Sequence, residues 1–231
     1  MLKIAALERL KVCKPVNRLL YISQCCKNKN VLDIGCYDET AIRLKNNEYW
    51  LHGLISENAK SVIGIDSSNL IKGKIRTGNN SVIIKQDLYN INTEFAKKYN
   101  VDIIIAGELI EHIPDVSKFL TILGKLYKGR ILVLSTPNST SLMNVLLALF
   151  NRESSHRDHI HVFSYKTLSS LCIKGKYKKF EIVPYYVKFT EMYLHSPKML
   201  GYFVLIIERL INIGEWIFPL FSGGYIVKIH L

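Results

Sequence analysis

The sequence predicts an α/β protein with a doubly wound sheet whose strands are mainly parallel. Its apolar residues fall into short runs rich in valine and isoleucine, each too short for a helix and separated from the next by a stretch of helical composition. That alternation is typical of buried parallel strands covered by helices on both faces. The predicted strands cover residues 31–35, 61–66, 82–84, 101–106, 130–136, 180–186 and 225–230.

One domain accounts for residues 1–231. The chain has 231 residues, of which 48% are hydrophobic, and no internal repeat or low-complexity linker divides it. We divide this domain into a basic helical arm (1–27), a core (28–190), and an apolar helical excursion with the final strand (191–231). In the arm, Pro15 interrupts apolar residues at helical spacing, which predicts two helices ahead of the core.

Positive charge is concentrated in two segments. The formal net charge is +12, yet Glu8 is the only acidic residue within 1–30, and residues 166–179 hold five lysines and no acid. The rest of the chain is nearly neutral, which argues against a charge spread over a nucleic-acid-binding body. The two segments suit contact with phosphate, an anionic membrane surface or an acidic substrate, or they are ordinary solvated surface.

Cysteine usage and hydropathy predict the compartment. The five cysteines are odd in number and lack paired metal-ligand spacing, so neither a disulfide framework nor a zinc ribbon is indicated. The sequence shows no secretory leader and no window with the roughly 18 uninterrupted apolar residues of a membrane span. We therefore expect a cytoplasmic protein.

Residues 198–221 predict a helix with a wide apolar face. Gly201, Glu208, Asn212 and Glu215 fall on one narrow stripe, and large apolar side chains cover most of the remaining circumference. A face of this kind has to be covered. The alternatives are the chain's own sheet, a second subunit in a homodimer, or a membrane interface, where the protein would be peripheral at the inner face.

Chemistry is expected just beyond the carboxyl ends of the strands, where ligands bind in open parallel sheets. Gly35 follows the first strand and allows a tight turn before a helix start, whose free N–H groups favour a carboxylate or phosphate. Asp66 ends the second strand, where a carboxylate can accept hydrogen bonds from both hydroxyls of a ribose.

Four segments resemble the ordered motifs of class I S-adenosylmethionine (SAM)-dependent methyltransferases: 31–36 (VLDIGC), 64–66 (GID), 86–88 (QDL) and 108–112 (ELIEH). The resemblance covers about residues 28–190, which would form the cofactor-binding core. It implies a Rossmann-like seven-stranded sheet with the last strand antiparallel, and SAM as the cofactor.

The resemblance also implies which residues bind the cofactor. Asp33, Gly35 and Cys36 would hold the methionine part of SAM, and Asp66 with Ser67 the ribose. Asp87 and Leu88 would hold the adenine, and Glu108 would lie on the side that faces the substrate. The first loop departs from the family, because only Gly35 remains of its two or three alternating glycines. Residues 49–52 are expected to form an inserted loop, because Gly35 and Asp66 are far apart in sequence.

The candidate catalytic residues are His159, His112 and Glu111. Glu111 and His112 follow Glu108 at i+3 and i+4, so the three share one face if they begin a helix, and His159 belongs to a histidine-rich segment, 156–161. Segments 135–138, 141–142, 156–159 and 163–168 are similar to methyltransferases of surface-glycan and related small-molecule pathways. We therefore favour metal-free O-methylation of a glycan or other small polar acceptor, with a histidine as general base.

Two alternatives stay open. Glu108, Glu111, His112 and His159 resemble the four residues with which small-RNA 3′-terminal ribose 2′-O-methyltransferases hold a divalent metal, and the basic segments would then bind RNA. The third hypothesis is a non-catalytic cofactor-binding module, supported only by the loss of glycines from the first loop. Glu111 and His112 could also simply orient their loop, and His52 and His161 are interpreted as local packing or loop residues.

Overall fold

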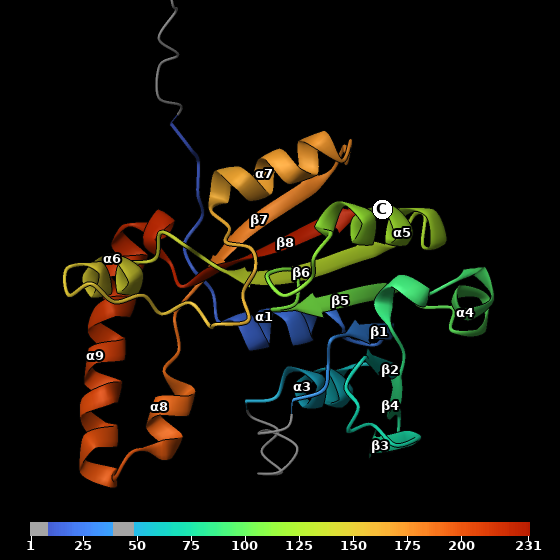
Figure 1. Cartoon of the computed structure of the whole chain (residues 1–231), viewed down its shortest axis with the longest axis horizontal. Helices are drawn as coiled ribbons and strands as arrows, with labels where there is room; N and C mark the ends of the chain where they lie inside the picture. The colour runs from blue at the N-terminus through green and yellow to red at the C-terminus, as the bar shows by residue number, and fades with distance from the viewer. Residues whose placement is uncertain (1–8, 39–48) are drawn as a thin grey trace, which may run out of the picture.

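The computed structural model describes residues 9–38 and 49–231 of the chain. Figure 1 shows a central twisted sheet with helices on both faces, and the strand order is β3-β4-β2-β1-β5-β6-β8-β7. The strands are β1 (Asn30–Ile34), β2 (Ser61–Asp66), β3 (Lys74–Gly78), β4 (Ser81–Lys85), β5 (Ile103–Gly107), β6 (Ile131–Pro137), β7 (Phe180–Tyr185) and β8 (Gly224–His230).

Helices separate most of the strands along the chain, but β2, β3 and β4 follow one another without the helix predicted between 66 and 82. The helices are α1 (Arg18–Cys25), α3 (Leu51–Asn58), α4 (Thr93–Lys98), α5 (Val116–Leu126), α6 (Leu142–Ala148), α7 (Tyr165–Lys174), α8 (Thr190–His195) and α9 (Lys198–Ile217), with short 3-10 turns η1 (Leu88–Asn90) and η2 (Pro219–Phe221). The helical excursion before the last strand is α8, α9 and η2.

The doubly wound α/β class and the antiparallel last strand are confirmed. Strands β4, β2, β1, β5 and β6 pair in parallel, and β8 runs antiparallel between β6 and β7. The count of seven strands is wrong for the described chain, because β3 adds an eighth strand antiparallel to β4. The sequence of β3, KIRTG, has only one large apolar residue. This edge strand therefore lacks the run of apolar residues from which the other strands were predicted.

The prediction of two N-terminal helices is wrong for residues 9–17, which form no helix, while residues 1–8 lie outside the described part. Val16 instead bridges to β7: its N–H donates to the carbonyl of Pro184 (3.0 Å), and its own carbonyl accepts from the N–H of Tyr186 (3.0 Å). Helix α1 begins only after Asn17, whose side chain caps it. The expected loop at 49–52 is wrong for Leu51 and His52, which begin α3, whereas Tyr49 and Trp50 precede the helix.

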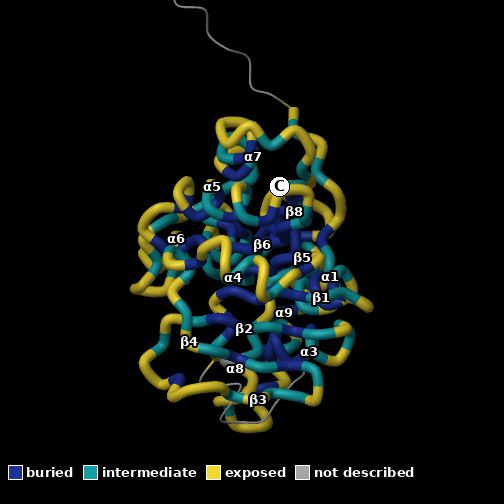
Figure 2. Tube along the Cα trace, turned by 90° about the vertical axis from the view of Figure 1, so that its right-hand side faces the viewer, coloured by how far each residue is buried: buried dark blue, intermediate teal, exposed yellow. Residues whose placement is uncertain are grey.

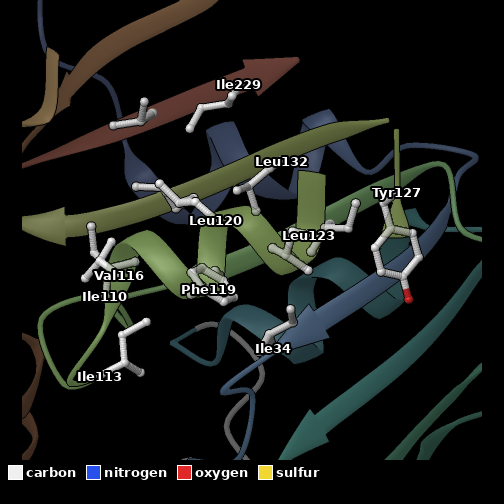
Figure 3. Packing of buried hydrophobic residues seen from close by; sticks show 14 of the residues in the cluster. Ile34, Ile110, Ile113, Val116, Phe119, Leu120, Leu123, Tyr127, Leu132 and Ile229 are labelled. Carbon is white, nitrogen blue, oxygen red and sulfur yellow. The ribbon is translucent and has the colours of Figure 1, made fainter. Parts of the chain in front are cut away.

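The largest hydrophobic core lies between the sheet and helix α5. Asp115 caps this helix by accepting the N–H of Lys118 at 2.8 Å. Phe119 and Leu123 then lie on the buried face and pack towards strand residues such as Leu132 (Figure 3). Figure 2 shows the consequence, a mostly buried set of central strands beneath exposed helix surfaces and loops. This rigid sheet fixes the strand ends from which the site is built.

Candidate active site

The carboxyl ends of β1, β2 and β4 meet at one edge of the sheet. Parallel pairing places Ile34 beside Ile65, and Asp66 beside Lys85. The loops that leave these strands therefore lie next to one another, in the place where open parallel sheets bind ligands. We call this region the donor half of the site.

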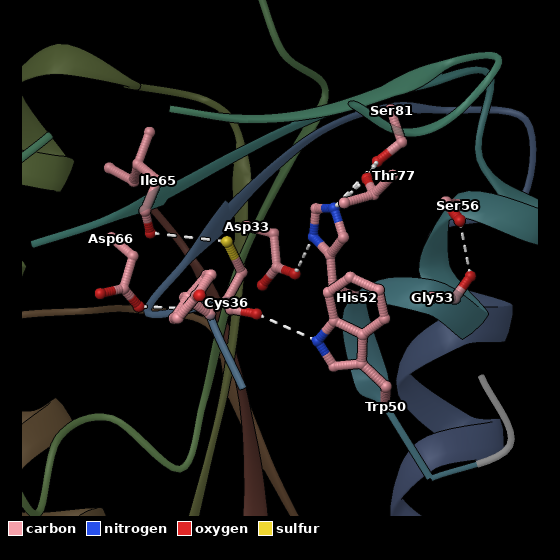
Figure 4. A network of polar contacts seen from close by, with 11 residues as sticks. Asp33, Cys36, Trp50, His52, Gly53, Ser56, Ile65, Asp66, Thr77 and Ser81 are labelled. Atoms are coloured by element: carbon pink, nitrogen blue, oxygen red, sulfur yellow. Dashed lines mark hydrogen bonds and ion pairs between the residues drawn. The ribbon is translucent and has the colours of Figure 1, made fainter. Parts of the chain in front are cut away.

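Asp66 fastens the loop after β1 to the end of β2 (Figure 4). Its Oδ2 accepts the N–H of Tyr37 at 3.1 Å, and its Oδ1 accepts the N–H of Ser68 at 2.9 Å. Each carboxylate oxygen has a second lone pair, so Asp66 can accept two further hydrogen bonds. Ser67 is exposed beside it.

Gly35 makes the turn after β1 in a conformation that favours glycine. Its φ is +71°, and a Cβ added there would lie 2.8 Å from Cδ1 of Leu109. A larger residue would be strained by its backbone and would press on the loop after β5. Gly35 therefore keeps this turn narrow, with its own backbone on the exposed side.

Cys36 follows Gly35 and turns its side chain inwards. Its thiol is buried 3.7 Å from the carbonyl of Ile65, and burial raises the pKa of this thiol well above its ordinary value. Gly64 leaves the space, because a Cβ there would lie 2.5 Å from Sγ of Cys36. Trp50 donates its indole N–H to the carbonyl of Cys36 at 3.1 Å. The thiol therefore lies within the core and faces no ligand space.

Asp33 is also buried, with its carboxylate engaged by His52. Nδ1 of His52 lies 2.8 Å from Oδ2 of Asp33, and Nε2 lies 2.8 Å from the hydroxyl of Ser81. Polar atoms of Asp33, Cys36 and His52 lie within 4.8 Å of one another, a spacing compatible with a metal ion. Protein groups already engage both ring nitrogens, so this cluster serves packing rather than ligation.

Asp87 and Leu88 follow β4 at the far side of the donor half. Asp87 is exposed, and its Oδ1 accepts the N–H of Tyr89 at 2.8 Å, which caps η1. Leu88 is partly buried and packs against the main core. The predicted cofactor residues thus divide into three groups: Gly35, Asp66, Ser67, Asp87 and Leu88 reach the surface of the donor half, Asp33 and Cys36 support it from within, and Glu108 lies apart.

A cavity of about 1070 Å³ adjoins the ends of β5, β6 and β7. We call it the acceptor cavity. Its wall holds Glu108, Glu111, Thr136, His159 and Tyr185, and helices α6, α8 and α9 close its outer side through Leu147, Met192 and Leu205. Many other lining groups are hydrogen-bonding side chains, among them Asn17, Arg18, Asn138, Ser139, Asn144, Ser154, Ser155, Tyr186 and Lys188.

Glu108 is held in place by two residues from distant parts of the chain. The hydroxyl of Tyr185 donates to its Oε1 at 2.8 Å, and the guanidinium of Arg18 lies 3.4 Å from its Oε2. The φ of Glu108 is +49°, the left-handed region that non-glycine residues adopt at a cost. Burial and the neighbouring Glu108 raise the pKa of Tyr185, so this phenol stays a donor.

Glu111, His112 and His159 come together at the cavity wall. One ligand atom from each lies within 4.8 Å of the others, and the rings of His112 and His159 meet edge to face at 4.6 Å. The carbonyl of Glu111 accepts the N–H groups of Ile160 (2.9 Å) and His161 (3.2 Å), which fixes the histidine-rich loop here. The expected helix does not form at 108–112, which is a turn, and α5 begins at Val116.

Burial shifts the pKa values of two groups of this cluster. Burial and the charge of Glu108 raise the pKa of Glu111 to about 7, and neither oxygen of Glu111 meets a hydrogen-bond partner among the described residues. Burial, together with His112 and His156, lowers the pKa of His159. At neutral pH His159 is therefore uncharged and able to accept a proton.

Glu108 does not join this cluster among the described residues, since Tyr185 and Arg18 hold its carboxylate. The structure thus brings together three of the four predicted metal ligands. Sequence reasoning missed Arg18 and Tyr185 as parts of the site. A basic residue in the arm and a tyrosine in a strand carried no signal, because only folding brings them to Glu108.

The comparisons with known proteins identify the family. A family model described as a methyltransferase domain matches residues 5–174, most of the chain. The chain is a member of this methyltransferase family. It has the fold of class I SAM-dependent methyltransferases, it is an enzyme of that class, and SAM is its methyl donor. A search of the curated proteins finds no match.

Solved structures share the fold at low identity. A SAM-dependent methyltransferase from Archaeoglobus fulgidus is 17% identical, with a TM-score of 0.50 over 92% of this chain and 90% of that one. The methyltransferase domain of bacterial CtHen1 is 15% identical, with a TM-score of 0.55 over 93% and 98% of the two chains. A protein from Thermotoga maritima, described as a possible histamine N-methyltransferase, is 14% identical, with a TM-score of 0.54 over 91% and 86%.

The donor half of this methyltransferase has the chemistry that SAM needs. The Gly35 turn lies at the surface, and each carboxylate oxygen of Asp66 keeps a lone pair for a further hydrogen bond. The position of the family's next loop glycine holds Tyr37, which is partly buried and packs against a small hydrophobic cluster that includes Cys36 and Trp50. The other missing glycine would be at residue 39, which lies outside the described part of the chain. The family match supports the enzyme prediction over the non-catalytic module.

Proposed function

We propose that this methyltransferase transfers a methyl group to a hydroxyl of a glycan or other small polar acceptor, with His159 as general base. The observation that carries the proposal is the position of His159 in the acceptor cavity, beside Glu111 and with a lowered pKa. An uncharged imidazole next to a buried carboxyl is suited to remove a proton from a hydroxyl. The many hydrogen-bonding groups of the cavity suit an acceptor rich in hydroxyls.

We propose these roles for the donor half: Gly35 for the methionine part of SAM, Asp66 with Ser67 for the ribose, and Asp87 with Leu88 for the adenine. Asp33 and Cys36 act through the packing of the loop, since both side chains are buried. SAM, when bound, supplies a methyl group on a sulfonium whose leaving group needs no protonation.

The residues of the acceptor cavity would align the hydroxyl and take up its proton. The acceptor oxygen gains the methyl carbon as its O–H bond breaks, and the proton moves to a ring nitrogen of His159. Glu111, ionised above a pH of about 7, would then stabilise the imidazolium. Glu108 would hold one side of the acceptor, with Tyr185 and Arg18 keeping its carboxylate in place.

A direct test compares acceptors and variants. The protein is incubated with SAM carrying a labelled methyl group and with three acceptors: a glycan extract, a polar small-molecule extract, and RNA with a 3′-terminal ribose. We expect label in a glycan or small-molecule fraction that a chelator leaves unchanged. His159→Ala should slow this transfer about 100-fold or more while SAM affinity, measured by calorimetry, is retained. A loss of SAM affinity with unchanged turnover would contradict the role of His159.

The second candidate is metal-dependent methylation of an RNA 3′-terminal ribose. The cluster of Glu111, His112 and His159 favours it, because mixed carboxylate and imidazole groups suit Mg²⁺ or Mn²⁺. The position of Glu108 counts against it. Label only in RNA, lost on chelation and restored by Mn²⁺, would select this candidate and reject the glycan proposal.

We also propose that the enzyme works in the cytoplasm, at the inner face of a membrane. The support for this location is the formal net charge of +12, since the cytoplasmic leaflet of a membrane is anionic and attracts basic proteins. None of the described helices is long and apolar enough to cross a bilayer.

A further inference from the structure

Helix α9 contacts the rest of the protein through a stripe that includes two glutamates. Its buried residues are Gly201, Val204, Glu208, Ile211 and Glu215, which recur at helical spacing on one face. In a helix that covers a core, this face is normally the most apolar one. Here the buried stripe is partly acidic.

The two acidic side chains of α9 bind the segment that follows β7. Glu208 accepts the N–H of Phe189 at 2.8 Å and the ammonium of Lys188 at 2.6 Å. Glu215 accepts the N–H of Val187 at 3.1 Å. Polar contacts thus attach α9 to the core and leave its apolar circumference facing outwards.

The opposite face of α9 exposes large apolar side chains. They recur at the same helical spacing, and the most exposed are Met199 (87%) and Tyr202 (70%). The complete row on this face is Met199, Tyr202, Phe203, Ile206, Leu210, Ile213 and Ile217. No described residue covers these side chains to the degree seen in the core.

Helices α6 and α8 extend this apolar face. Figure 1 shows both beside α9, at the side of the molecule away from α5 and β3. Leu149 (74% exposed) and Phe150 (75%) follow the end of α6, and Met192 and Leu194 are exposed on α8. We call the exposed side chains of α6, α8 and α9, with Leu149 and Phe150, the apolar patch.

Basic residues border the apolar patch. Lys198 and Arg209 are exposed on the flank of α9, next to its apolar row. The basic arm reaches the other end of the helix, where Lys14 donates to the carbonyl of Trp216 at 2.6 Å and its ammonium lies 4.0 Å from the centre of the Trp216 ring. Amphipathic helices at membrane interfaces combine apolar, aromatic and basic residues in this way.

We propose that the apolar patch docks on the surface of an anionic lipid bilayer, with its apolar side chains inserted shallowly and Lys14, Lys198 and Arg209 at the level of the headgroups. Each basic residue near such a surface adds to the attraction. The formal net charge of +12 favours this occupant over a second copy of the chain, because two copies repel each other.

The apolar patch and the acceptor cavity share their helices. Leu147, Met192 and Leu205, from α6, α8 and α9, line the cavity. Docking would therefore bring the outer wall of the cavity close to the headgroups. The docking itself does not depend on the methyl acceptor proposed above, so each proposal can fail without the other.

The test is sedimentation of the full chain with vesicles of phosphatidylcholine alone or with about a third of phosphatidylglycerol. We expect at least about ten-fold tighter binding to the anionic vesicles, weakened by high salt. Phe203→Glu combined with Leu210→Glu should reduce this binding at least about ten-fold. The matched control is Leu70→Glu combined with Ile173→Glu, two residues that are equally exposed outside the patch and should leave binding unchanged.

Retained SAM binding and an unchanged melting temperature would show that the patch variant is folded. A charge reversal, Lys198→Glu with Arg209→Glu, gives a second readout, because it should lower affinity for anionic vesicles and leave weak binding to neutral ones unchanged. Equal binding of all variants to anionic vesicles would overturn the proposal. A second result would also overturn it: the folded wild-type chain does not bind vesicles and forms a dimer, and the patch variant is monomeric.

Discussion

The Nδ1 atom of His52 lies 2.8 Å from Oδ2 of Asp33, and both side chains are buried (Figure 4). Nε2 of the same ring meets the hydroxyls of Ser81 (2.8 Å) and Thr77 (3.1 Å). One imidazole thus joins β1, α3 and the β3–β4 hairpin behind the donor half of the site. The Gly35 turn begins two residues after Asp33, so its position depends on this contact.

His52→Ala should destabilise the protein by about 2–4 kcal/mol, because it leaves the buried carboxylate of Asp33 and the hydroxyl of Ser81 without their partner. SAM affinity should fall as well, since the Gly35 turn loses its support. Denaturant unfolding and calorimetry measure the two effects. The control is His195→Ala on the exposed end of α8, which should change stability by less than about 0.5 kcal/mol. Equal stability of the two variants would contradict a structural role for His52.

Gly64→Ala should destabilise the protein by about 1–3 kcal/mol, as expected for overpacking of a tight core. The added Cβ would lie 2.5 Å from Sγ of Cys36 and 2.7 Å from Cε1 of His52. Thermal unfolding gives the readout. In Gly78→Ala, the Cβ would lie 3.5 Å from the nearest atom, so this variant is a matched control with little expected effect. A Gly64→Ala protein as stable as the control would mean that the Cys36 side chain is free to move.

Asp66→Ala should weaken SAM binding about ten-fold or more, because it removes two acceptors for ribose hydroxyls and releases the N–H groups of Tyr37 and Ser68. Isothermal titration gives the affinity directly. Ser67→Ala, at the exposed neighbouring position, should change SAM affinity much less. The comparison distinguishes the effect of the Asp66 carboxylate from the effect of any change in its loop. Unchanged affinity in Asp66→Ala would remove Asp66 from the cofactor site.

Glu111 should make stability depend on pH. Its pKa is raised to about 7 in the folded protein, whereas an unfolded glutamate has a pKa of about 4.3. The folded state therefore binds more protons between these values, and its stability falls as pH rises through this window and levels off above about 7.

Glu111→Gln should remove about 2–3 kcal/mol of this fall, measured as the difference in unfolding free energy between about pH 4.5 and pH 7.5. The control is Glu181→Gln, which changes an exposed carboxylate of β7 and should leave the pH profile as it is. If Glu111→Gln and the wild-type chain show the same dependence of unfolding free energy on pH, the pKa of Glu111 is not raised in the folded state.

The sequence predicted the central strands well because their burial demands short runs of valine and isoleucine. Strand β3 escaped detection because a strand at the exposed edge needs no such run. Residues 9–17 of the arm were wrongly predicted as helical, because the apolar spacing does not reveal the pairing of Val16 with β7. Long-range pairing of this kind overrides local periodicity.

The structure places the predicted motif residues at or near the ends of strands, and their roles stay predictions. Glu111, His112 and His159 were candidates from their chemistry alone, and the structure brings them together. The partners of Glu108 could not be predicted, because Tyr185 lies 77 residues away in sequence and meets Glu108 only when β7 enters the sheet. The buried state of Asp33 was equally hidden, since His52 reaches it from another element.

The pairing of Val16 with the β7 segment also protects an open edge. β7 is the last strand of the sheet, and the outward backbone groups of such a strand are a template for the strand of another molecule. The arm occupies the carbonyl of Pro184 and the N–H of Tyr186 in this position. A chain shortened to begin at residue 18 would leave those groups unpaired, and light scattering should show that it self-associates at concentrations where the full chain stays dispersed.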